Sequence, residues 1–289
     1  MGRSMSIRRS PQWSAGYPEI PKLSRDTNAA AFPSILAVVD DADDRAALHE
    51  CHAFGVRAAH CRTPDDVAGR IERARLIVYD PSADHSSDDA LSETIAASGL
   101  PICCRVSQVT PVTLRRIRLI ARSSSAHLCV RRGATPHSLP SHLLGGPSSD
   151  AYSYVLNRLS KSRLTDEQFW MVALLTSQSH NVLAVKDFKH LVGNSLRTLQ
   201  VRLRHLQLPS PHILVTWHRM IGAEWGILTG KPVAEAARVM GFSSPDVLAA
   251  WTQRLLQASP RNAVLTHGIF PVVEAYVRVL EHGYAKAGS

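Results

Sequence analysis

A short basic segment, 192–211, carries the side chains whose chemistry is most distinctive in this sequence. It reads VGNSLRTLQVRLRHLQLPSP, and a helical period places four of its residues on one side: Arg197, Gln200, Val201 and Arg204. These residue types predict a polar, basic outer face on a helix, of the kind that suits a polyanion partner.

The same segment contains the signals of two helices joined by a turn. Gly193 can end the first helix in the left-handed conformation, and Ser195 can cap the second. Four leucines at spacings of three and four predict the core-facing side of the second helix: Leu196, Leu199, Leu203 and Leu206. A helix that enters a major groove requires this arrangement with a polar, basic outer face. A basic helix face exposed to solvent is the alternative for this segment alone.

A second segment, 232–260, repeats this arrangement. An apolar stripe leads to Gly241, and Ser243 or Ser244 can cap the helix that follows. The apolar side predicted for that helix comprises Val247, Leu248, Trp251, Leu255 and Leu256. One long helix predicted over 211–228 joins the two units and would hold them about one turn of DNA apart.

Three aspartates in the front half of the chain have a different chemistry. Asp40 and Asp41 follow one apolar run, and Asp80 follows another. Because strand ends on one edge of a doubly wound sheet lie around a crevice, we expect the three carboxylates to meet there. Oxygen ligands suit Mg²⁺, so a magnesium site is possible, and no other cofactor is expected. In the alternative, Asp40 and Asp41 only cap the following helix.

Apolar runs alternate with helical patterns before residue 137 and give way to helices after it. The predicted strands are 34–40, 56–61, 74–80, 100–107 and 126–132, and the helices between them are 43–55, 64–74 and 110–123. This alternation predicts a doubly wound parallel α/β domain. The helices predicted later are 151–161, 165–178, 184–192, 195–206, 211–228, 232–240, 244–256 and 271–282.

Composition shifts divide the chain into four parts. We predict a loose basic tail over 1–32, the α/β domain over 33–136, a linker rich in Pro, Gly and Ser over 137–150, and an all-α domain over 151–289. Helix 110–123 carries four arginines: Arg115, Arg116, Arg118 and Arg122. We interpret them as a solvated face, with a subunit contact or a DNA contact as the alternatives.

Charge and cysteine content narrow the class of protein. The 289 residues carry a net charge of +9, with −7 over 34–100 and +7 over 151–289, and a basic excess suits a polyanion partner. The five cysteines are odd in number and contain no C-x-x-C pair, which favours free thiols in a reducing compartment. No apolar run approaches the ~20 residues of a membrane span, and the N-terminus lacks a secretory pattern. We expect a soluble cytoplasmic protein with no membrane partner.

The region from about 165 to 265 resembles the DNA-binding domain of AraC-type transcription regulators. The matching pieces are SLRTLQVRLRHLQLPSP, the tryptophan-bearing helix 211–228, VAEAARVMGFSSPDVL, and the Ser-Pro pair at 259–260. The resemblance implies two helix-turn-helix units whose recognition helices face one side of double-stranded DNA. It also implies RNA polymerase as a partner, and a homodimer is possible.

The resemblance implies roles for individual residues. Arg197, Gln200 and Val201 would face base edges, and Ser195, Thr198 and Arg204 would lie near phosphates. In the second unit Asp246 and Ala250 stand where polar or basic residues are usual, so Asp246 would repel phosphate unless it accepts a bond from cytosine. We therefore expect the first unit to supply most of the sequence readout. The second unit would anchor through Ser243, Ser244 and Arg254.

The α/β half resembles the receiver domain of response regulators, in which the aspartate after the third strand accepts a phosphoryl group. Here that position is Asp80. Ser107 is displaced by one place from the usual hydroxyl position, and Arg131 replaces the usual lysine. We therefore predict a transcription regulator controlled by a receiver-like domain without phosphorylation, and no enzymatic activity or catalytic residue. The alternatives are a response regulator phosphorylated on Asp80 and, more remotely, a magnesium-dependent enzyme of phosphate chemistry.

Overall fold

The computed structural model describes seven stretches of the chain: 34–39, 57–83, 89–106, 108–123, 128–132, 150–177 and 182–282. The chain divides into two compact units, Met1–Phe32 and Pro33–Ser289, and every described residue lies in the second. The predicted tail and the predicted linker, apart from Asp150, lie outside the described residues. Within these stretches, no helix combines the length and the apolar composition that crossing a bilayer requires.

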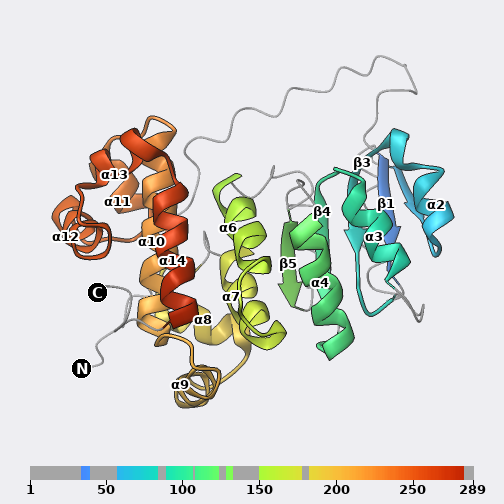
Figure 1. The fold of residues 1–289 in the computed structure, drawn as a ribbon, viewed down its shortest axis with the longest axis horizontal. Helices are drawn as coiled ribbons and strands as arrows, with labels where there is room; N and C mark the ends of the chain where they lie inside the picture. The colour runs from blue at the N-terminus through green and yellow to red at the C-terminus, as the bar shows by residue number, and fades with distance from the viewer. Residues whose placement is uncertain are drawn as a thin grey trace, which may run out of the picture. The chain divides into compact units, whose positions relative to one another are not determined.

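Five short strands form one parallel sheet in the order β2-β1-β3-β4-β5 (Figure 1). Their bounds are Ser34–Val38 (β1), Arg57–His60 (β2), Ala74–Tyr79 (β3), Ile102–Val106 (β4) and Leu128–Arg132 (β5). The two strands that follow β1 in the chain lie on opposite sides of it, β2 on one side and β3 on the other. The predicted parallel α/β region, followed by a helical region, is confirmed.

Both faces of the sheet are buried, as the uninterrupted apolar runs require. Leu36 pairs with Ile77, and Ile77 pairs with Ile102, on the face that packs against the helices. Residues next to these in each strand point to the opposite face of the sheet. The buried side chains on that face are Ile35, Ala37, Val39, Val78 and Cys103. Among the cysteines whose side chains the structure describes, Cys61, Cys103 and Cys104 are buried in the core.

Three described helices accompany the sheet: α2 (Pro64–Ala68), α3 (Ala90–Ala97) and α4 (Pro111–Ser123). α2 ends earlier than predicted, and a single 3-10 turn over Ile71–Arg73 leads into β3. Helix α3 was not predicted, because its eight residues include only two large apolar side chains, Leu91 and Ile95. Both of these side chains are buried.

Eight of the helices in the second half begin and end within two residues of their predicted bounds. They are α6 (Asp150–Ser160), α7 (Asp166–Ser177), α8 (Val185–Val192), α9 (Leu196–His205), α10 (Pro211–Leu228), α11 (Val233–Val239), α12 (Pro245–Leu256) and α14 (Phe270–His282). A further helix, α13 (Pro260–His267), was not predicted. The sequence carried a signal for it, because Ser259 before Pro260 is a typical N-cap followed by a proline at the first helical position.

α10 forms the centre of the helical half. Trp217 and His218 of α10 are buried against Tyr276 of α14, with the Trp217 and Tyr276 rings 5.5 Å apart. His218 Nε2 and the Tyr276 hydroxyl are hydrogen-bonded at 2.9 Å. Complete burial lowers the pKa of His218 to about 3, so the ring is neutral at physiological pH.

α4 joins the two halves, and α6 and α7 lie beside it and β5 (Figure 1). Arg118 donates hydrogen bonds to three carbonyl oxygens: that of Ser160 at the end of α6, at 3.0 Å, and those of Ser162 and Leu164 in the loop that follows, both at 2.6 Å. A helix end leaves its last carbonyls, such as that of Ser160, without partners in the helix itself. Arg118 also forms an ion pair with Asp166 in the first turn of α7, at 2.8 Å. The Arg118 side chain is only 14% exposed, so these hydrogen bonds to the protein take the place of hydrogen bonds to water.

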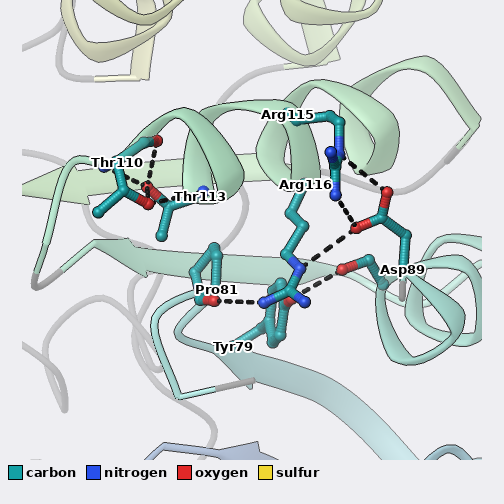
Figure 2. A network of polar contacts seen from close by, with 8 residues as sticks. Tyr79, Pro81, Asp89, Thr110, Thr113, Arg115 and Arg116 are labelled. Atoms are coloured by element: carbon teal, nitrogen blue, oxygen red, sulfur yellow. Dashed lines mark hydrogen bonds and ion pairs between the residues drawn. The ribbon is translucent and has the colours of Figure 1, made fainter. Parts of the chain in front are cut away.

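A second arginine of α4 points toward the sheet (Figure 2). Arg116 donates to the carbonyl oxygen of Pro81 at 3.1 Å and to the Asp89 carboxylate at 3.3 Å. Arg115 binds the same carboxylate, and its hydrogen bond is the main cause of the lowered pKa of Asp89. The interpretation of these arginines as a solvated face was therefore wrong for Arg116 and Arg118, because the chain's own backbone carbonyls and carboxylates bind them.

We expect Arg118→Ala to lower the free energy of unfolding by about 2–4 kcal/mol, because it removes the partner of Asp166 and of the carbonyl oxygens of Ser162 and Leu164. Urea denaturation followed by circular dichroism measures this change. Arg115→Ala is the matched control, since Arg115 is 55% exposed and its loss should cost less than about 1 kcal/mol. Equal effects of the two substitutions would contradict the role assigned to Arg118.

Candidate nucleic-acid interface

The first helix pair, α8 and α9, is built as the sequence predicted. Asp187 accepts hydrogen bonds from the amides of Leu183 and Ala184, which closes the start of α8. Gly193 ends α8 with φ +69°, in the left-handed region. The Ser195 hydroxyl then accepts a hydrogen bond from the amide of Thr198 at 3.1 Å, which caps α9.

All six residues assigned to DNA contact in this pair are exposed: Ser195, Arg197, Thr198, Gln200, Val201 and Arg204. On the opposite side Leu199 and Leu203 are buried, as predicted. Leu196 was predicted to face the core, and this was wrong, because its side chain is 43% exposed. It lies in the first turn of α9, where the helix projects beyond the packed core.

Residues in the first turn of α7 hold the inner side of α9. The Glu167 carboxylate pairs with Arg202 at 3.0 Å, so this arginine is turned away from the outer face. The side-chain amide of Gln168 donates to the carbonyl oxygen of Leu206 at 2.6 Å, at the end of α9. These two residues follow Asp166, the partner of Arg118, so one helical turn contacts both α4 and α9.

The second helix pair, α11 and α12, has the same local plan. Gly241 turns the chain with φ +71°. Of the two predicted caps, Ser244 is the one used, since its hydroxyl accepts from the amide of Val247 at 3.3 Å. Arg219 of α10 fixes the turn by donating to the carbonyl oxygens of Met240, at 2.7 Å, and Gly241. Its guanidinium lies over the Phe242 ring, 4.2 Å from the ring centre.

The outer side of α12 is less basic than that of α9. Ser243, Asp246 and Arg254 are exposed, and Ser244 is half-buried. Arg254 lies over the ring of Trp251, 5.5 Å from its centre. Val247 was predicted on the apolar core side, and this was wrong, because it is 37% exposed. Leu248 alone among the predicted apolar residues is fully buried.

A buried carboxyl group connects α10 to α12. Glu224 is completely buried, and its Oε1 lies 3.0 Å from the hydroxyl of Thr252, which also bonds the carbonyl oxygen of Leu248. A neutral Glu224 can donate to Thr252 while Thr252 donates to Leu248. An ionised Glu224 would compete with that carbonyl for the single hydroxyl hydrogen. Burial raises the pKa of Glu224 to about 8, and its Oε2 has no hydrogen-bond partner.

The charges of the two pairs differ. Residues 185–205 contain five basic and one acidic side chain, whereas residues 233–256 contain two of each. Phosphates of a nucleic acid attract Lys and Arg, so the charge of the first pair would attract a nucleic acid more strongly than the charge of the second.

Exposed polar residues that the sequence analysis did not assign lie in the first turn of α13. Arg261 and Asn262 are exposed, and the Asn262 amide donates to the Ser259 hydroxyl at 3.3 Å. The Ser-Pro start of α13 could have indicated them.

The carboxylates predicted for the front half are only partly described. Asp40, Asp41, Ser107 and the side chain of Arg131 lie outside the described residues. Asp80 is 2% exposed, and its Oδ1 accepts a hydrogen bond from the amide of Ser82 at 2.8 Å. This bond closes the turn after β3. In the described part of the chain, no group of three or more His, Cys, Asp or Glu is placed to hold a metal ion.

Comparison of the chain with models of protein families, with curated proteins and with solved structures finds no match.

The buried carboxyl group predicts a pH-dependent stability. In the unfolded chain Glu224 ionises near its ordinary pKa of 4.5, but in the fold it holds its proton up to about pH 8. Between these values the folded state binds more protons, so its free energy of unfolding falls as pH rises. Glu224→Gln keeps the shape without ionising. We expect it to match the wild type at pH 5 and to be more stable by about 2–4 kcal/mol at pH 8.

Thermal and urea unfolding of both proteins at the two pH values measures the difference. Glu235→Gln, at an exposed position of α11, is the control and should follow the wild type at both pH values. A Glu224→Gln variant that lost stability equally at pH 5 and pH 8 would show that the carboxyl is not held neutral.

Proposed function

We propose that the chain is a transcription regulator of the AraC type that binds double-stranded DNA sequence-specifically through two helix-turn-helix units. The observation that carries this proposal is the repetition of one local plan. In each pair a left-handed glycine, Gly193 or Gly241, is followed by a serine-capped helix with an exposed outer face. The helix α10 joins the two pairs, as a reader of two successive stretches of major groove requires.

The first unit supplies most of the sequence readout. Arg197 donates to the acceptor edge of guanine, Gln200 binds adenine, and Val201 contacts a thymine methyl group. Ser195, Thr198 and Arg204 contact phosphates and set the register of the helix on the duplex. The exposure of all six side chains, and the anchoring of Arg202 on the inner side, support this division of roles.

The second unit binds beside the first and anchors the protein through Ser243, Ser244 and Arg254. Its position relative to α10 depends on two contacts, the half-buried one of Arg219 with the turn and the buried one of Glu224 with Thr252. These contacts support a fixed distance between the two recognition helices. RNA polymerase is the proposed protein partner, and a homodimer is the proposed assembly.

The α/β half is proposed to control DNA binding as a receiver-like domain without phosphorylation. The burial of Asp80 and the use of its carboxylate in the turn after β3 support a phosphorylation-independent role. Control would reach the reader through contacts that are continuous in the fold. Arg118 binds Asp166, and the next two residues of α7 bind α9.

We expect Arg197→Ala to weaken binding to the preferred duplex by about 1–3 kcal/mol and to relax the preference at one base pair. Selection of bound fragments from random DNA, followed by fluorescence anisotropy, measures both effects. Arg202→Ala removes an arginine from the same helix but on its inner side, so it should leave the base preference unchanged. If Arg197→Ala selected the same sequences as the wild type, the assignment of Arg197 to a base would be wrong.

Arg204→Ala should instead weaken binding to all duplexes by a similar factor, because it removes a phosphate contact. Titration over a range of salt concentrations should then give a slope smaller in magnitude by about one. The preferred sequence should stay the same. A changed base preference with an unchanged salt slope would place Arg204 on a base instead of a phosphate.

A further inference from the structure

The two recognition helices can be compared position by position, because each starts at a serine whose hydroxyl accepts a hydrogen bond from the amide three residues later. Counting from Ser195 and Ser244 gives equivalent positions on α9 and α12. Two places after the cap stand Arg197 and Asp246, six places after it Val201 and Ala250, and nine places after it Arg204 and Gln253. All six side chains are exposed, so both sets belong to the outer face of their helix.

The charge at the first of these positions is reversed. An arginine has only hydrogen-bond donors, and an ionised aspartate has only acceptors. In the major groove guanine presents two acceptors, whereas cytosine presents the N4 amino group as a donor, and Asp is a recognised partner of that group. We propose that Asp246 reads the N4 amino group of a cytosine, at the place in the second unit's site where Arg197 reads guanine in the first. This inference rests on the proposed DNA binding and deepens it.

The short side chains of α12 fit this reading. An aspartate reaches less far than an arginine, so the helix backbone must approach the bases more closely. Ala249 and Ala250, five and six places after the cap, stand where α9 has Gln200 and Val201. Smaller residues at these two places remove side-chain bulk between the helix and the groove. The aspartate therefore occurs on the recognition helix that can approach more closely.

A different role for Asp246 is a purely local one. An acidic residue in the first turn stabilises a helix through its dipole, and Asp246 lies in the first turn of α12. The two roles predict different behaviour toward DNA. A helix-stabilising aspartate has no effect on base preference, whereas a cytosine reader also repels phosphates on unmatched DNA. Removal of its charge should then strengthen non-specific binding while it abolishes one base preference.

The experiment uses the full-length chain and duplexes selected from a random library with the wild type. Affinities are measured for the four base pairs at each position of the selected site. For the wild type we expect one position of the second unit's site at which cytosine is preferred about 5- to 150-fold. Asp246→Asn has nearly the same shape and can pair with adenine through two bonds, so its preference at that position should move to adenine.

Glu235→Gln is the matched control, because it removes an exposed carboxylate from the first turn of the neighbouring helix, α11. It should leave every base preference unchanged. Identical preferences for the wild type and Asp246→Asn would overturn the inference, as would a change that Glu235→Gln also produces. The wild-type measurement needs no variant, so a site with no cytosine preference in its second half overturns the inference even if Asp246→Asn does not fold.

The outcomes also separate this inference from the proposed function. If the wild type selects no sequence at all, sequence-specific binding fails. If the wild type selects a site whose first half depends on Arg197, but Asp246→Asn leaves the base preferences in the second half unchanged, only the reading of cytosine fails.

Discussion

The guanidinium of Arg118 binds three carbonyl oxygens, one at the end of α6 and two in the loop that leads to α7, and the junction between the α/β half and the helical half depends on this contact. The same group pairs with Asp166, which begins α7. Glu167 and Gln168, the next two residues, hold the inner side of α9. One arginine of the α/β half therefore fixes the helical turn from which the exposed basic helix is positioned. A displacement of α4 would therefore act on α9 through the first turn of α7.

The second helix pair depends on two polar groups of α10, the half-buried Arg219 and the buried Glu224. Arg219 binds the carbonyl oxygens of the turn between α11 and α12, and Glu224 meets Thr252 inside the core. A buried carboxyl without a charged partner is costly when ionised, and this one lies at the contact between α10 and α12. Both groups favour one position of α12 relative to α10 because the hydrogen bonds that they form with the turn and with Thr252 can be made only there. Apolar contacts alone would fix that position less specifically.

Particular elements show how far the sequence could be interpreted. Gly193 and Ser195 specified a turn and a cap by local chemistry, and both occur as predicted. Apolar runs specified the strands because both faces of the sheet are buried. Leu196 and Val247 were misplaced because periodicity gives the apolar side of a helix but not where neighbouring elements stop covering it. α3 was missed because too few large residues mark its buried side.

The sequence by itself determined the five strands, most of the helices, the cap of α9 and the outer residues of α9, because these follow from hydrogen bonding and periodicity within a few positions of the chain. Only the tertiary structure decided the partners of the arginines of α4. Arg115, Arg116 and Arg118 are alike in sequence, yet one is exposed, one reaches the loop after β3 and one binds α6 and α7. Their partners are 26 to 48 residues away along the chain. No local pattern specifies which carbonyl or carboxylate a long side chain will meet at that separation.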